Sequence, residues 1–366
     1  QTGRFKTSFP AIQAKPGVEY FLNFYASLKN EDGLLKAGTK LADAQVSLPF
    51  YQPFVAEVQS SPVIADDAAS LLTLTAGNLS VGFDKETGAL ISYKEGSTEL
   101  IKEALRPNFW RPVTDNDMGN GMNKTLRPWR DAGRQAKLLS MEQKALGKEA
   151  YEVVSHYKLP VGESDFIVTY HFSGKGYLDV NCTFIPGNDT LPLLPRMGVS
   201  ITLNRQFSQM EWLGRGPHEN YIDRNTSSYV GLYKGSVADQ YFPYDRPQEN
   251  GNKTEVRWMS LTDTAGQGLM AVGQPYISTS AYLFPTEYLD EPGLRKSQRH
   301  LSDIQFKDMV TWNIDLKQMG VGGDTSWGAY PHQPYLIPAE RMSFSFRFCP
   351  AKQNGVSGNR QYLNFK

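Results

Sequence analysis

Cysteine is nearly absent from this chain, which has only Cys182 and Cys349 in 366 residues. Two cysteines so far apart match neither a dense disulfide framework nor a CxxC metal or redox pair. We expect two unpaired thiols in the core, with a single bridge as the alternative. Long apolar runs are absent too: none reaches the ~18 residues that span a bilayer, and no basic-then-apolar leader opens the chain. We therefore expect a soluble protein with no membrane partner.

An excess of charge of either sign is also missing, because 38 Lys and Arg balance 38 Asp and Glu. Nucleic acids and anionic membranes are held mainly by clustered positive charge, so neither is an expected partner. The motifs GxGxxG, GxxxxGK[ST], HExxH and GxSxG do not occur, so nucleotide-binding, zincin and serine-hydrolase functions have no support. Helical patterns are confined to short stretches near 286–289 and 301–304, which excludes Rossmann and barrel architectures.

What the chain does contain favours an all-β fold. Aromatic residues make up 12% of the sequence, and 32 glycines and 22 prolines supply turns. A three-strand meander is predicted over 71–95. Further strands are predicted at 19–28, 43–48, 151–159, 165–172, 177–185, 197–203, 255–263, 268–273 and 342–350. No repeat of 20–50 residues is visible, which argues against propellers and solenoids.

The strand pattern divides the chain unequally. Residues 1–60 hold only two or three strands, too few to bury a core of their own, so we interpret them as part of a domain. A polar stretch at 61–67 is the expected linker, and 68–366 form one large antiparallel domain. The first residue is Gln1, not Met, which suggests a piece of something longer.

Irregular segments concentrate the polar residues that could carry function. In 108–123, Asp115, Asn116 and Asp117 precede Gly119. The DxDxDG spacing and final Glu of a calcium loop are absent, so no metal site is predicted. The glycines suit either a loop that changes shape or a plain turn.

Two further polar segments, 211–231 and 241–258, offer a choice between catalysis and structure. His218 beside Glu219 could form an acid–base pair, but a buried hydrogen-bond network that ties a long connection to the sheet is the favoured interpretation. Glu249 and Asn250 before Gly251 favour a structural turn. The predicted network comprises His218, Glu219, Asn220, Tyr221, Asp223, Arg224, Glu249 and Asn250.

A glycine-rich loop at 319–330 carries Asp324 and Trp327. An exposed indole suits a sugar, because the C–H face of the sugar packs on an aromatic ring while its hydroxyls take hydrogen bonds from neighbouring residues. The alternative is an ordinary core tryptophan.

These loops resemble known sequences. The segments FWRPVTDNDMGNGM, WLGRGPHENYIDR, PYDRPQENG and MGVGGDTSW, in this order, resemble the carboxy-terminal part of bacterial β-galactosidases of glycoside hydrolase family 2. The resemblance covers about residues 17–350. It implies that residues 1–60 are the later strands of an immunoglobulin-like β-sandwich. Residues 68–366 would be a β-supersandwich similar to galactose mutarotase.

The resemblance also implies a reaction. The parent enzymes hydrolyse terminal β-D-galactosides with retention, using two glutamates on a TIM barrel. This chain contains no barrel, so we expect no catalytic residue and no cofactor or metal here, with magnesium and sodium held by the missing part. The fragment alone would be inactive. Its expected partners are a β-galactoside, the rest of the parent chain and further copies of the parent in a homo-oligomer, in a bacterial cytoplasm or periplasm.

Residue by residue, the resemblance places Trp327 and Asp324 at the sugar site. It makes Asp115, Asn116, Asp117 and Gly119 part of a mobile loop that closes toward that site. The family commonly has Gln where His218 stands, so a catalytic histidine is not implied. Two alternatives remain: a freestanding aldose 1-epimerase using His218 with Glu219 or Asp223, and a carbohydrate-binding or scaffolding module without catalysis.

Overall fold

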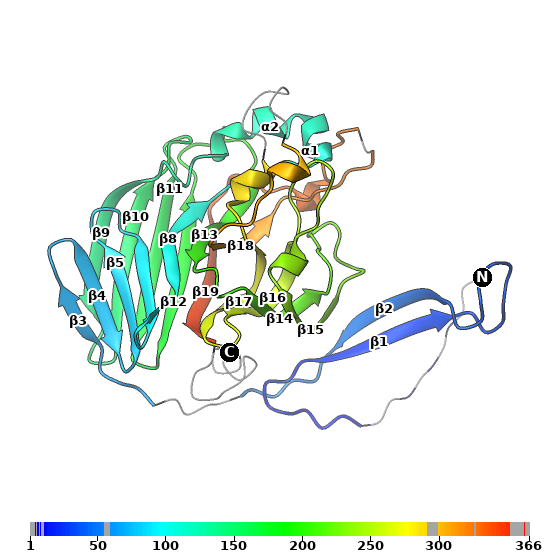
Figure 1. Cartoon of the computed structure of the whole chain (residues 1–366), viewed down its shortest axis with the longest axis horizontal. Helices are drawn as coiled ribbons and strands as arrows, with labels where there is room; N and C mark the ends of the chain where they lie inside the picture. The colour runs from blue at the N-terminus through cyan, green and yellow to red at the C-terminus, as the bar shows by residue number, and fades with distance from the viewer. Residues whose placement is uncertain are drawn as a thin grey trace. The chain divides into compact units, whose positions relative to one another are not determined.

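The computed structural model describes residues 4, 6, 8, 11–54, 59–290, 299–325, 327–351 and 362. The chain forms two compact units, Gln1–Glu57 with Arg360–Lys366, and Val58–Asn359 (Figure 1). The prediction of a linker at 61–67 is wrong for residues 64–67. Residues Ile64–Asp67 form β3, which pairs with β4 (Leu71–Ala76) and so belongs to the second unit.

The first unit is an antiparallel hairpin of β1 (Tyr20–Ser27) and β2 (Lys40–Leu48). Both strands match the prediction, and both leave large apolar side chains in solvent, including Phe24, Tyr25 and Val46. Two strands cannot enclose a core. That this unit is a piece of an immunoglobulin-like sandwich stays a prediction.

The second unit is dominated by a twelve-stranded sheet whose strand pairs are all antiparallel (Figure 1). One path runs β15-β14-β16-β17-β19-β12-β11-β10-β9, while β18 pairs with β17 and β13, and β13 with β8. The strands are β8 (Ile101–Asn108), β9 (Lys137–Ala145), β10 (Ala150–Lys158), β11 (Asp165–Ser173), β12 (Tyr177–Ile185), β13 (Arg196–Leu203), β14 (Gln209–Gly216), β15 (Tyr229–Ser236), β16 (Lys253–Thr262), β17 (Gly268–Tyr282), β18 (Val310–Gln318) and β19 (Met342–Pro350). The all-β prediction is confirmed.

A smaller antiparallel sheet packs against the large one. It contains β3, β4, β5 (Leu79–Asp84), β6 (Leu90–Glu95) and β7 (Thr98–Glu99), and it includes the predicted meander. Side chains alternate between buried and partly exposed along β4 and β11, as a strand covered mainly on one face requires. Phe83 and Tyr170 join the two sheets edge to face, with ring centroids 4.9 Å apart.

Helices are short in the described part of the chain. They are α1 (Asp115–Asn120), α2 (Met122–Thr125) and the 3-10 turns η1 (Arg127–Trp129), η2 (Ala238–Gln240), η3 (Thr286–Leu289), η5 (Leu301–Asp303) and η6 (Gln333–Tyr335). The helical stretches expected near 286–289 and 301–304 are η3 and η5. In the part of the chain that the structure describes, no helix has the length and apolar character needed to cross a membrane.

Two segments expected to be irregular are partly regular. Residues 108–123 contain α1 and the first two residues of α2, and the segment 211–231 begins inside β14 and ends inside β15. In β14 the inward positions are Met210, Trp212, Gly214 and Gly216. Two glycines among four inward positions weaken the apolar alternation that marks a strand, which is why the sequence pattern was misleading here.

Candidate functional site: four loops at one end of the sheet

Strand register gathers the four polar segments at one end of the large sheet. In the pairing of β13 with its neighbours, Gly198 lies opposite Asn108 at the end of β8, and Arg196 lies opposite Gln318 at the end of β18. The loops that leave β8 and β18 therefore start at the same end of the sheet, on either side of β13. The first residue of β16, Lys253, pairs with Thr279, which in turn pairs with Ile314 on β18, so the segment before β16 joins the same end.

The loop after β8 folds into α1 because its first residues cap the helix. The Thr114 side chain accepts from the Asp117 backbone N–H, and the Asp117 carboxylate accepts from the Thr114 backbone N–H, which satisfies two N-terminal donors reciprocally. Asp117 is fully buried and forms an ion pair with Arg111, which is also fully buried, at 3.0 Å. The same Arg111 nitrogen donates to the Gly320 carbonyl at 3.0 Å. Arg111 thus links α1 to the loop that carries Trp327.

Backbone contact joins these two loops further along. A Cβ on Gly328 would lie 2.2 Å from the Gly119 carbonyl carbon, so only glycine allows this approach. Gly328 also has φ +103°, a conformation that other residues rarely adopt. The Asn116 side chain donates to the Ala329 carbonyl at 3.0 Å. The first and fourth segments therefore form one continuous surface.

Trp327 lies on this surface with 89% of its area exposed. The alternative of a core tryptophan is therefore wrong for this chain. Asp324 is also exposed, and its carboxylate is 2.7 Å from Nε2 of His332, an interaction that raises the pKa of His332. A role for Trp327 and Asp324 in sugar binding stays a prediction.

The second and third polar segments, 211–231 and 241–258, hold these loops in place with hydrogen bonds and an ion pair. Asp115 accepts from Nε of Arg246 at 2.6 Å and from Gln248 at 3.0 Å, which ties α1 to the third segment. Asp223, in the second segment, accepts from the Gly322 backbone N–H at 2.8 Å. Three of the four residues expected in a mobile loop, Asp115, Asn116 and Asp117, therefore have side-chain partners here. Whether the loop moves stays a prediction.

His218 and Glu219 have different partners. His218 is exposed, with its Nε2 3.0 Å from the Ser228 hydroxyl. The Glu219 carboxylate accepts from Arg224 at 2.8 Å, from the Tyr244 hydroxyl at 2.6 Å and from the Gly251 backbone N–H at 2.7 Å. A carboxylate held by three donors serves a structural function more readily than proton transfer to a histidine that it does not contact.

The remaining members of the predicted network connect loops to strands. The Asn220 side chain accepts from both the N–H and the hydroxyl of Thr254, and its carbonyl accepts from Asn252. Tyr221 reaches the Glu249 carboxylate at 3.4 Å, and the Tyr282 hydroxyl donates to the Asn250 carbonyl at 2.6 Å. These contacts support a structural interpretation of the network.

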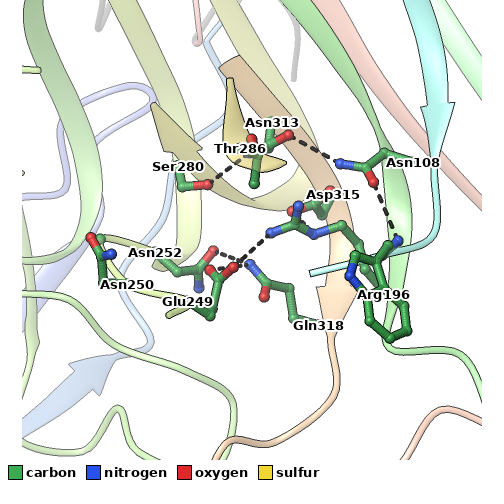
Figure 2. A network of polar contacts seen from close by, with 12 residues as sticks. Asn108, Arg196, Glu249, Asn250, Asn252, Ser280, Thr286, Asn313, Asp315 and Gln318 are labelled. Atoms are coloured by element: carbon green, nitrogen blue, oxygen red, sulfur yellow. Dashed lines mark hydrogen bonds and ion pairs between the residues drawn. The ribbon is translucent and has the colours of Figure 1, made fainter. Parts of the chain in front are cut away.

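A cluster of buried charges lies beneath the loops, and sequence reasoning missed most of it. Arg196 lies 3.3 Å from Asp315 and 3.5 Å from Glu249. Gln318 donates to Glu249 at 3.2 Å and to Asn252 at 3.0 Å. Figure 2 shows these side chains together. All three charged side chains are almost completely buried. The available signal was Arg196 at the start of the largely apolar segment 196–203. Asp315 gave none, because its segment 310–318 contains several other polar residues.

Burial governs the protonation of this cluster. Removal from water raises the pKa of Asp315 to about 7, and the nearby Arg196 guanidinium only partly opposes that rise. Burial also raises the pKa of Glu249. One cation faces two carboxylates, and none of the three Arg196 nitrogens has hydrogen-bond geometry with a described residue.

Neither cysteine chemistry nor a metal centre is apparent in the described residues. Cys182 and Cys349 are buried and unpaired, which confirms the prediction, and burial raises the pKa of Cys182. Within the described ranges, no group of three or more His, Cys, Asp or Glu side chains could hold a metal ion.

Comparison with known proteins decides the family. The family described as β-galactosidase small chain matches residues 75–348. The chain belongs to the β-galactosidase small-chain family. A β-galactosidase of Priestia megaterium is 35% identical over 344 residues, covering 93% of this chain and 32% of that protein. A β-galactosidase of Lactobacillus delbrueckii subsp. bulgaricus is 31% identical over 348 residues, covering 93% of this chain and 33% of that protein. This small chain thus spans about a third of the length of the curated relatives it matches.

Two solved structures of low sequence identity align with most of this small chain. A galactose 1-epimerase from Lactobacillus acidophilus has a TM-score of 0.44 and 8% identity, covering 80% of this chain and 99% of that chain. An aldose epimerase homologue from C. elegans has a TM-score of 0.43 and 9% identity, covering 81% of this chain and 100% of that chain. Likeness at this level carries no argument about activity.

Proposed function

We propose that this chain is the carboxy-terminal region of a retaining β-galactosidase and forms the mouth of its active site without supplying the catalytic glutamates. The observation that carries the proposal is the joined surface of the first and fourth loops, with Trp327 89% exposed on it. An indole that is held in solvent by a braced loop has an unused apolar face, and such a face suits the C–H side of a sugar ring.

The hairpin of the first unit supports the part of the proposal that places this chain in a longer protein. Phe24, Tyr25, Leu41 and Val46 are 45–61% exposed on β1 and β2. A lone two-stranded hairpin with exposed apolar side chains is marginal in water, so these strands need further strands to cover them. The relatives are about three times as long as this chain, so a parent chain could supply those strands.

In the proposed enzyme, this chain binds and orients rather than performs chemistry. Trp327 would offer a stacking surface to the sugar or its leaving group, and exposed Asp324 would accept hydrogen bonds from hydroxyls. Arg111, Asp117 and the Gly119–Gly328 contact would fix that surface before substrate arrives, which reduces the entropy lost on binding. The two glutamates that cleave the glycosidic bond would come from the rest of the parent chain.

A freestanding epimerase finds less support in this geometry. That reaction needs a histidine acid and a carboxylate base near one sugar. His218 contacts Ser228 rather than a carboxylate, while Glu219 is bound by three donors and Asp223 by a backbone N–H. We therefore keep the small-chain proposal.

Trp327→Ala in the full-length enzyme is expected to raise KM about tenfold and to lower kcat by less than ~3-fold. Stacking of roughly 1–1.5 kcal/mol would stabilise the bound substrate and the transition state alike. Removing the indole therefore raises KM and changes kcat little. Steady-state kinetics on a chromogenic β-galactoside measures both constants. Trp327→Phe is the matched control, because a smaller flat ring should recover most of the affinity. A large loss of kcat at unchanged KM would contradict a simple stacking role.

A further inference from the structure

A cavity of about 290 Å³ opens beside β8, and no residue of the Trp327 loop is among those that line it. Its walls come from the end of β8, from the segment after η1, and from η3 with Asp290. Three arginines, Arg106, Arg130 and Arg134, line it together with Trp110. The volume lies near the lower end of the ~300–1,000 Å³ that is usual for small-molecule sites. The described residues thus form a small cavity whose wall holds three guanidinium groups and three carboxylates.

Close backbone packing sets two of these arginines beside each other. A Cβ on Gly133 would lie 1.9 Å from the Pro107 carbonyl oxygen, so the segment that carries Arg134 lies directly on the strand that carries Arg106. Ala132, next to Gly133, is completely buried. Burial lowers the pKa of Arg134, and the positive charge of Arg106 lowers it further. The fold therefore holds two like charges together at the cavity wall.

Three carboxylates, Asp131, Glu287 and Asp290, share the cavity wall with the three arginines. The negative charge of Asp131 opposes part of the lowering of the pKa of Arg134. Asp290 is bound by Nε of Arg130 at 2.8 Å and by the Trp110 indole N–H at 3.0 Å. Glu287 forms an ion pair with Arg134. The half-buried guanidinium of Arg106 has no hydrogen bond or ion pair with a residue that the structure describes. It is therefore available to a ligand.

The floor of the cavity adds donors rather than acceptors. The Thr286 hydroxyl oxygen accepts from the Asn313 amide at 3.4 Å, which leaves the hydroxyl proton available to a ligand. Asn108 donates to Asn313 at 3.1 Å, and its amide oxygen already accepts from the Trp110 backbone N–H. Ser200 also lines this cavity. A ligand that accepts several hydrogen bonds fits these groups better than one that donates them.

We propose that this cavity binds a small oxyanion, a carboxylate or phosphate group, between Arg106 and Arg134. Planar guanidinium groups bind both anions with paired, charge-assisted hydrogen bonds. A bound anion would also relieve the repulsion between the two arginines. This proposal stands apart from the sugar-binding role of Trp327 and uses none of its residues.

The test is a titration of the 366-residue chain with inorganic phosphate and, separately, with citrate at constant ionic strength, followed by calorimetry. We expect binding that Arg106→Gln weakens by about tenfold or more, because one charge-assisted bidentate contact is lost. Arg341→Gln is the matched control: it removes the same charge from an exposed position outside the cavity, and its affinity should equal that of the unchanged chain. Phosphate binding without citrate binding assigns the site to phosphate, and the reverse assigns it to carboxylates.

Three results would overturn the proposal: no binding of either anion, equal binding by the Arg106→Gln and unchanged chains, or binding of galactose in place of the anions with the same dependence on Arg106. Circular dichroism shows whether the Arg106→Gln variant is folded. If it is not, Arg134→Gln takes its place, with a loss of at least tenfold expected, because it also leaves the Glu287 carboxylate without its cation.

Discussion

Replacing Arg111 by methionine is expected to lower the free energy of unfolding by about 3–5 kcal/mol. The variant removes a fully buried cation and leaves the Asp117 carboxylate buried without its charged partner. It also removes the hydrogen bond to the Gly320 carbonyl, so the attachment of α1 to the Trp327 loop weakens. Urea denaturation followed by circular dichroism measures the change, and tryptophan fluorescence reports on the loops.

The matched variant for this prediction is the double substitution Arg111→Met with Asp117→Asn. An asparagine carries no charge and still accepts from the Thr114 backbone N–H, so the capping contact survives. We expect the double variant to regain at least half of the stability that Arg111→Met loses, because no uncompensated charge remains buried. Equal stability of the single variant and the unchanged chain would contradict the assignment of Arg111 as the link between the loops.

Asp315→Asn is expected to stabilise the protein above pH 7 and to flatten its pH dependence. Burial raises the pKa of Asp315 from 3.8 to about 7. Between these two pH values the folded chain holds a proton that the unfolded chain has released, so stability falls as pH rises through this window. The fall is about 2–4 kcal/mol and is complete above the folded pKa. Asparagine cannot ionise, and Arg196 keeps Glu249 as its counter-ion.

Urea denaturation at pH 5 and at pH 8 tests this second prediction. The unchanged chain should be more stable at pH 5, and Asp315→Asn should remove most of the difference. Asp308→Asn is the control, because Asp308 lies 88% exposed in an ion pair with Lys102 and should change stability by less than ~1 kcal/mol. A flat profile for the unchanged chain, with Asp315→Asn destabilised at both pH values, would show that Asp315 is needed in its charged form.

Local pattern was sufficient to find most of the strands. The alternation in 165–172 and 177–185 predicts β11 and β12, and the turns between 71 and 95 predict the small sheet, because in each case one face is buried and the other is not. It failed at β14, where glycines occupy inward positions, and at α1, where a capping box begins a helix of only six residues. Residues 64–67 are too few for a period to be visible, which explains the misplaced linker.

Only part of the candidate site could be predicted from the sequence, because local pattern records composition but not register or packing. Trp327, Asp324 and the residues of α1 stand in loops whose composition is unusual, so the sequence marks them. Arg196 and Asp315 do not stand out, because only the register of β13 with β18 brings them together: Arg196 lies opposite Gln318, and Gly198 lies opposite Asp315. Arg106 and Arg134 become a pair through the packing of Gly133 on β8, which no local pattern records.

Hydrolysis of a chromogenic β-galactoside by the purified 366-residue chain, alone and after mixing with the missing amino-terminal part of a parent β-galactosidase, tests the central claim most directly. We predict no hydrolysis by the chain alone and restored hydrolysis on mixing, because the catalytic glutamates would lie in the added part and the Trp327 surface in this one. Hydrolysis by the chain alone would contradict the account and would direct attention to the carboxylates of Glu219, Asp223, Glu249 and Asp324.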